Sequence, residues 1–158
     1  MQKITPHLWY DTQAENAVNF YVSIFPHSKV LTTTHYTETG AKMSGQPIGG
    51  VMNISFELNG QKFMAINAGP IFKFNESISF MIHCKDQAEI DYYWDKLTAD
   101  GGMEQPCGWV KDKFGLSWQV VPEALADIMK NTPPEKIERI MQVMMTMKKL
   151  NIAALQGA

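Results

Sequence analysis

The stretch CGWVKDKFGLSWQVVP, residues 107–122, holds the pattern around which the predicted fold is built. Two apolar, partly β-branched segments flank a glycine-containing centre, which predicts a β-hairpin. Lys111, Asp112 and Lys113 are expected to form its solvated tip. Gln119 falls on the outgoing strand among apolar and aromatic neighbours. Because an interior amide needs hydrogen-bond partners, Gln119 either reads a ligand or is satisfied by the backbone.

The N-terminal half predicts one βαβββ module. Thr12-Gln13-Ala14-Glu15 fits a capping box that opens a helix, and Asn59-Gly60 indicates a tight type I′ hairpin turn. The expected elements are a strand at 4–10, a helix from 12 to about 25, a strand at 28–36, a flexible loop at 37–50, and strands at 51–58 and 61–68.

An internal repeat predicts a second module of the same kind. Asp86-Gln87-Ala88-Glu89 restates the first capping box at an offset of 74 residues, 86 minus 12. A strand at 77–84 precedes this second helix, and the hairpin at 107–122 follows it. At this offset His7 aligns with Met81, and aligning the two hairpin glycines places Met64 against Gln119. The fold class is therefore α+β, with two tandem βαβββ modules.

A helical extension is predicted after residue 122. It consists of a short helix at 123–130, a longer helix opened by a capping box at Thr132, and a last turn capped by Asn151. We expect residues 1–122 to form one domain of paired modules, about 1–70 and 76–122, with 123–158 as the extension. A monomer would have to expose or fold back the longer helix's apolar stripe, so we predict a homodimer; the stripe is Ile137, Ile140, Met141, Met144 and Met147.

Composition excludes several classes of partner. The chain has 158 residues, 14 basic and 16 acidic, and a net charge of −2, which gives no electrostatic basis for binding nucleic acid or an anionic membrane. No window approaches the roughly 18 apolar residues of a membrane span, and the N-terminus has no apolar signal region. We expect a cytoplasmic protein in which Cys84 and Cys107 are reduced thiols.

Four stretches of the chain resemble a known family. ITPHLWYD at 4–11, FMAINAGPIFKFNESISFMIHCKDQAEIDYYWDKL at 63–97, the hairpin at 107–122 and MQVMMTMKKLNIAAL at 141–155 resemble the PhnB-like branch of the vicinal oxygen chelate superfamily. That superfamily includes glyoxalases, bleomycin-resistance proteins and dihydroxybiphenyl dioxygenases. The resemblance implies a glyoxalase-like fold whose paired modules curl around a ligand cavity. Many PhnB-like members carry a name derived from 3-demethylubiquinone methyltransferase.

The resemblance also implies where a metal would bind. Superfamily enzymes hold a divalent metal through His or Glu side chains on the first and last strands of each module. Carried over to this chain, those positions fall on or near Thr5, Met64, Ser79 and Gln119, none of which is acidic or a histidine. His7 lies two residues from Thr5, but one imidazole and one amide do not make an anionic site. We therefore expect no bound metal.

The predicted function is that of a small-molecule-binding protein of unassigned ligand. The alternatives are an enzyme, either a methyltransferase or a metal-dependent lyase or dioxygenase, and a partner-binding scaffold that uses the Met-rich tail. The chain has no glycine-rich loop between strand and helix, which argues against a dinucleotide or adenosyl cofactor, and we expect no cofactor. The expected ligand-binding residues are His7, Trp9, Met64, Ser79, Met81, Cys107, Trp109 and Gln119.

None of these residues is assigned a catalytic role. His7 has no acidic neighbour in its strand, which favours a pocket wall or a core histidine over a general base. Cys107 has no histidine at a fixed spacing that would activate it, which favours a structural thiol over a nucleophile. Asn67 at the end of a predicted strand is expected to be a turn residue.

Overall fold

The chain divides into two compact units, Met1–Phe74 and Asn75–Ala158, each with its own four-stranded sheet. The structure is a computed structural model that describes residues 2–158, with the side chain of Asp127 excepted. Each unit follows the order β, α, β, β, β, apart from short added helices. The predicted α+β fold of two tandem βαβββ modules with C-terminal helices is confirmed.

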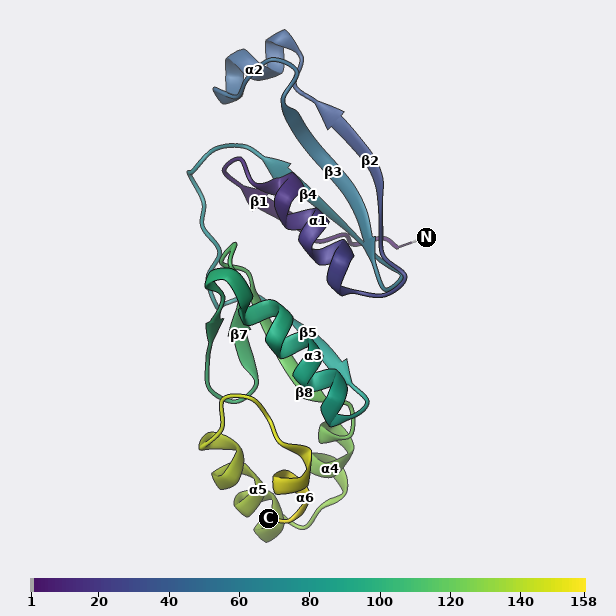
Figure 1. The fold of residues 1–158 in the computed structure, drawn as a ribbon, viewed down its shortest axis with the longest axis vertical. Helices are drawn as coiled ribbons and strands as arrows, with labels where there is room; N and C mark the ends of the chain where they lie inside the picture. The colour runs from purple at the N-terminus through teal and green to yellow at the C-terminus, as the bar shows by residue number, and fades with distance from the viewer. Residues whose placement is uncertain (1) are drawn as a thin grey trace. The chain divides into compact units, whose positions relative to one another are not determined.

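In the first unit, helix α1 lies on one face of a mixed sheet (Figure 1). The strand order is β1-β4-β3-β2, in which β1 runs parallel to β4 and the other neighbours are antiparallel. Apolar side chains of α1 meet those of the sheet, and Val18, Tyr21 and Phe56 are almost fully buried. The elements are β1 His7–Tyr10, α1 Ala14–Ile24, β2 Lys29–His35, α2 Glu38–Ser44, β3 Val51–Leu58 and β4 Gln61–Asn67.

The β3–β4 hairpin has the predicted turn, because Asn59 and Gly60 both adopt positive φ, 46° and 83°. The segment expected to be a flexible loop instead contains α2. The Thr37 side chain accepts a hydrogen bond from the Gly40 amide, and Gly45 ends the helix at a φ of 71°. Capping at both ends supports this short helix, whose weak apolar pattern gave no sign of it.

The capping box predicted at Thr12 is wrong. Helix α1 begins at Ala14, and its N-cap residue makes no side-chain cap. Asn67, at the end of β4, supplies the cap instead: its Oδ1 accepts from the Ala14 amide at 2.8 Å. Its Nδ2 donates to the Val51 carbonyl at 3.1 Å. A long-range cap of this kind satisfies one of the unpaired amides at the start of the helix without leaving a local sequence pattern.

In the second unit, α3 lies across a sheet of order β5-β8-β7-β6, with β5 parallel to β8 (Figure 1). The capping box at Asp86 is confirmed, since Asp86 Oδ1 accepts from the Glu89 amide at 2.9 Å. The elements are β5 Ser79–Cys84, α3 Gln87–Thr98, a 3-10 turn Ala99–Gly101, β6 Met103–Glu104, β7 Trp109–Lys111, β8 Ser117–Pro122, α4 Leu125–Asn131, α5 Pro134–Met145 and α6 Ile152–Gln156.

The predicted equivalence between the modules is visible in the strand registers. His7 pairs with Met64 across β1 and β4, and Met81 pairs with Gln119 across β5 and β8. Each pair lies on a parallel first-and-last strand pair of its own unit. The repeat therefore extends from the sequence pattern to the position of single residues in each sheet.

The hairpin tip is not the solvated turn that was predicted. Asp112 is only 2% exposed. Its Oδ1 accepts from the amides of Phe114 and Leu116 at 2.9 Å and 3.0 Å, and its Oδ2 accepts from Trp118 Nε1 at 2.8 Å. Three donors offset the desolvation of this carboxylate, so the turn folds around Asp112 rather than leaving it in water.

The C-terminal helices pack on the second unit. Asn151 caps α6 as predicted, accepting from the Ala154 amide at 2.9 Å, whereas α5 begins behind Pro133 without the side-chain cap expected at Thr132. The buried side chains of this cluster are Val121, Ile140, Leu150 and Leu155, surrounded by Leu125, Ile128, Val143, Met144 and Met147. Part of the predicted apolar stripe is thus folded back within the chain.

Candidate ligand-binding faces

Each sheet has one face covered by its helix and one face that carries most of the predicted site residues. In the first unit, the face not covered by α1 carries His7 and Trp9 from β1 and Met64 from β4. The Trp9 ring meets Phe72 edge-on at 4.9 Å, and its Nε1 donates to the Gly69 carbonyl at 2.9 Å. The structure thus places three of the predicted residues side by side.

His7 on this face is exposed, and its Nε2 lies 3.3 Å from the Asn53 amide oxygen on β3. An amide oxygen can orient an imidazole, but it cannot exchange a proton with it. This contact supports a positioning or contact role for His7 rather than acid–base work.

In the second unit, Gln119 lies between Met81 on β5 and Trp109 on β7. Its Nε2 donates to the Ser79 hydroxyl oxygen at 2.8 Å, so the amide is held by a side chain and not by the backbone. Met81 beside it is 49% exposed. An oriented amide with apolar neighbours, open to solvent, is a typical arrangement for recognising a small molecule.

Cys107 lies at a shallow hollow next to this face. The hollow has a volume of about 360 Å³ and is lined by Glu76, Gln105, Pro106, Cys107 and Trp109. The C-terminal extension fixes the position of Cys107, because the Cys107 amide donates to the Met147 carbonyl at 2.8 Å. Its sulfur lies 3.5 Å from Met145 Sδ. Cys107 is therefore tied to the end of α5 while contributing to the wall of the hollow.

The polar residues of the hollow were not predicted. The Glu76 carboxylate forms an ion pair with Lys111 and accepts from Gln105 Nε2 at 3.2 Å. The Lys111 ammonium, and next the Gln105 amide, hold the pKa of Glu76 below its ordinary value. Lys111 was detectable, because it follows Trp109 by two residues on one strand and so shares its face. Glu76, in the connector before β5, leaves no such signal.

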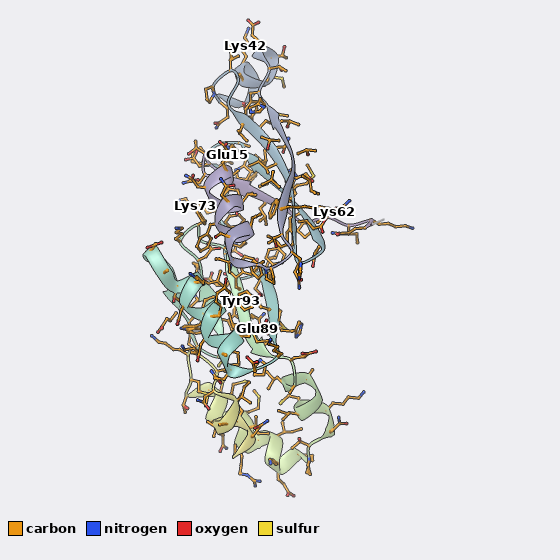
Figure 2. All side chains as sticks on the ribbon, turned by 45° about the vertical axis from the view of Figure 1, so that its right-hand side comes forward. Glu15, Lys42, Lys62, Lys73, Glu89 and Tyr93 are labelled. Carbon is orange, nitrogen blue, oxygen red and sulfur yellow. The ribbon has the colours of Figure 1, made fainter. Side chains whose placement is uncertain are left out.

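Burial makes the other thiol unreactive. It raises the pKa of Cys84 to about 12, and the nearby Glu89 adds to the shift. Burial, and next the nearby Glu89 carboxylate, raises the pKa of Tyr93 to about 12 as well. Figure 2 shows the side chains of Tyr93 and Glu89 on α3. The Cys84 thiol and the Tyr93 hydroxyl therefore stay protonated at neutral pH and belong to the core packing around α3.

The four positions that the superfamily uses for metal do not form a ligand set. Thr5 lies before β1 and is exposed, and Met64 offers only a thioether. Ser79 and Gln119 hydrogen-bond to each other. Within residues 2–158, apart from the Asp127 side chain, no group of three or more His, Cys, Asp or Glu residues is arranged to hold a metal ion.

The fold and its two faces define a chain with the glyoxalase-like architecture of the vicinal oxygen chelate superfamily. The chain belongs to the PhnB-like family described as 3-demethylubiquinone-9 3-methyltransferase, whose family model matches residues 2–121. A comparison with curated proteins gave no match. Among residues 2–158, no helix has the length and apolar character needed to cross a membrane.

Solved structures agree with this assignment. The PhnB protein from Bacillus cereus is 34% identical over 77% of this chain and 99% of its own, with a TM-score of 0.68. A Pseudomonas aeruginosa protein is 19% identical over 78% of this chain and 98% of its own, at a TM-score of 0.62. The Listeria monocytogenes fosfomycin resistance protein FosX, solved with Mn(II) and sulfate, is 14% identical over 83% of this chain and 98% of its own, at a TM-score of 0.54. The last two matches show the fold alone.

Proposed function

We propose that this chain is a small-molecule-binding protein, with Gln119 and Ser79 as the polar groups that recognise the ligand. The observation that carries the proposal is the 2.8 Å hydrogen bond between these side chains on a face shared with Met81 and Trp109. Gln119 uses its nitrogen for Ser79, and its amide oxygen is then the acceptor that it offers to a ligand.

The first unit has a proposed contact face of its own. His7, Trp9 and Met64 supply an imidazole, an indole and a thioether there, which suit an apolar or aromatic ligand group. Cys107 is proposed as a wall residue and not as a nucleophile, because its loop is fixed by backbone hydrogen bonds to the C-terminal extension. We also propose a cytoplasmic location, which suits the two free thiols, Cys84 and Cys107.

Native mass spectrometry of freshly purified protein tests this proposal directly. We expect a non-covalent organic adduct on the folded protein that is released when the protein is denatured. A spectrum of bare protein that also fails to bind any member of a diverse fragment library would contradict the proposal.

Two enzymatic functions compete with this proposal. The family's description names methyl transfer to 3-demethylubiquinone, and transfer of a labelled methyl group from S-adenosylmethionine to that acceptor would establish it. We do not expect methyl transfer, because the chain has no glycine-rich loop between strand and helix for an adenosyl cofactor.

The FosX structure contains Mn(II), and about one tightly held transition metal per chain, lost on His7→Ala, would support metal-dependent chemistry here. We do not expect a bound metal, because Met64, Ser79 and Gln119 stand where the superfamily has His or Glu ligands.

A further inference from the structure

A carboxylate of the chain itself occupies the hollow beside Trp109. Glu76 comes three residues before β5, Gln105 lies between β6 and β7, and Lys111 ends β7. Oε1 of Glu76 receives both the Lys111 ammonium and the Gln105 amide. Two donors from different segments therefore converge on a single carboxylate oxygen.

The two donors are better buried than the carboxylate that they hold. The Lys111 side chain is 20% exposed, against 47% for Glu76. An exposed ion pair contributes little to stability, so a competing anion can displace Glu76 at small cost. The donors belong to the sheet and its hairpin loop, whereas Glu76 belongs to the connector that precedes β5.

The strand that pairs with Lys111 carries a buried hydroxyl, Ser117. Ser117 pairs with Lys111 across β7 and β8 and with Ser79 across β8 and β5. Its side chain is fully buried, and among the described residues its Oγ has no hydrogen-bond partner. Leaving a buried hydroxyl unsatisfied costs about 1–3 kcal/mol, and native proteins have few such groups.

We propose that Lys111 and Gln105 form a carboxylate-binding seat, that Glu76 fills it in the free protein, and that the ligand is a small aromatic monocarboxylic acid whose ring packs on Trp109. This inference rests on the proposed ligand-binding function and names its ligand class. The ligand displaces Glu76, and its carboxylate then accepts from Lys111 and Gln105 in place of the Glu76 carboxylate.

The chemistry of the seat favours a monoanion. One ammonium and one neutral amide balance a single negative charge, and a dianionic phosphate would remain undercompensated. The other lining residues, Pro106, Cys107 and Trp109, offer apolar and aromatic surface. A volume of about 360 Å³ falls at the lower end of the range for small-molecule sites and fits a single-ring ligand.

Titration with benzoate, followed by the indole N–H resonance of Trp109 in NMR spectra, tests the proposal. Glu76→Gln keeps the shape of the side chain but removes its charge, and we expect it to bind benzoate about tenfold more tightly than the wild type. A tenfold difference is expected if Glu76 leaves the seat open in about a tenth of the wild-type molecules. Lys111→Met should bind benzoate at least about tenfold more weakly than wild type. Benzamide, the neutral analogue, should not distinguish the variants.

Asp100→Asn serves as the matched control, since it breaks the Lys113–Asp100 ion pair of the same unit without touching the hollow. It should bind benzoate as the wild type does. Equal benzoate affinity in wild type, Glu76→Gln and Lys111→Met, or the absence of benzoate binding in all of them, would contradict the proposed carboxylate-binding seat. The general binding function would survive such a result if Gln119→Leu still removed a co-purified ligand, so the two failures are distinguishable.

Discussion

The side-chain amide of Gln119 donates to the Ser79 hydroxyl at 2.8 Å, across the parallel pair formed by β8 and β5. In the other unit the position equivalent to Gln119 is Met64, which cannot make such a bond. At equivalent positions, the second unit therefore has the hydrogen-bonded pair of Gln119 and Ser79, and the first unit has the thioether of Met64. This asymmetry is the reason for assigning the polar recognition groups, Gln119 and Ser79, to the second unit.

Removing the Asp112 carboxylate should destabilise the protein strongly. Asp112→Ala leaves two backbone amides and the Trp118 indole N–H without their acceptor, each at a cost of about 1–3 kcal/mol. Asp112→Asn keeps one oxygen and should lose less, and Lys113→Ala at the exposed tip should lose almost nothing. Urea denaturation measures all three. Equal, small losses would mean that Asp112 does not organise the hairpin.

The cap of α1 provides a second stability test. Asn67→Ala should lower the free energy of unfolding by about 1–2 kcal/mol, because the Ala14 amide loses its acceptor and the Val51 carbonyl loses a donor. Thr12→Ala is the control and should be nearly neutral, since Thr12 is exposed and provides no cap. A larger loss from Thr12→Ala than from Asn67→Ala would restore the local capping box.

The docking of the C-terminal extension should depend on pH. Lys149 contacts Asp91 at 3.0 Å and Asp95 at 3.4 Å. The Lys149 ammonium, and next Gln87, lower the pKa of Asp91; Asp91 in turn raises the pKa of Lys149. A lowered carboxyl pKa contributes stability above the unfolded value, roughly pH 4, and this contribution is lost as pH falls through the folded value. A raised lysine pKa contributes stability below roughly pH 10, lost as pH rises through the folded value.

Lys149→Met should therefore be less stable than wild type near neutral pH, and the difference should shrink as pH falls through the lowered pKa of Asp91. Denaturation at neutral pH and near pH 3, each at low and high salt, measures it. A difference that changes with neither pH nor salt would show that packing of the lysine stem, and not its charge, holds the extension.

A homodimer stays a prediction, but its basis changes. The chain itself covers Ile140, Met144 and Met147 of the α5 stripe. The remaining apolar exposure includes Ile78, at 68%, and Met145, at 64%. Light scattering over a dilution series should give twice the chain mass. Ile78→Glu should lower the measured mass toward that of the monomer when Ile78 lies in the dimer interface. Monomer mass at every concentration would exclude the dimer.

Local patterns in the sequence predicted most of the fold. The Asn59-Gly60 turn, the Asp86 cap and the apolar strand β8 were all readable, because each depends on residues close together in the chain. The error at Thr12 has the opposite cause. Asn67 reaches α1 from 53 residues away. The error at Asp112 is local, because a charged residue between two lysines reads as a solvated turn although its carboxylate accepts from Phe114, Leu116 and Trp118.

The candidate site divides in the same way. Strand alternation placed Met81, Trp109 and Gln119 on one face, and the registers of β5, β7 and β8 bring them together. Strand alternation could not find Glu76, which lies in a connector without periodicity. Residues whose role depends on packing between distant segments leave no pattern in a single sequence.

The measurement that tests the central claim most directly is native mass spectrometry of Gln119→Leu beside wild type and Gln142→Leu, an exposed glutamine on α5. If Gln119 reads the ligand, wild type and Gln142→Leu carry the adduct and Gln119→Leu does not. Gln119→Leu should then lose only about 1 kcal/mol of stability, as expected for one neutral hydrogen bond. Retention of the adduct by Gln119→Leu, together with a marked fall in its melting temperature, would show that Gln119 is a structural amide and would contradict the account.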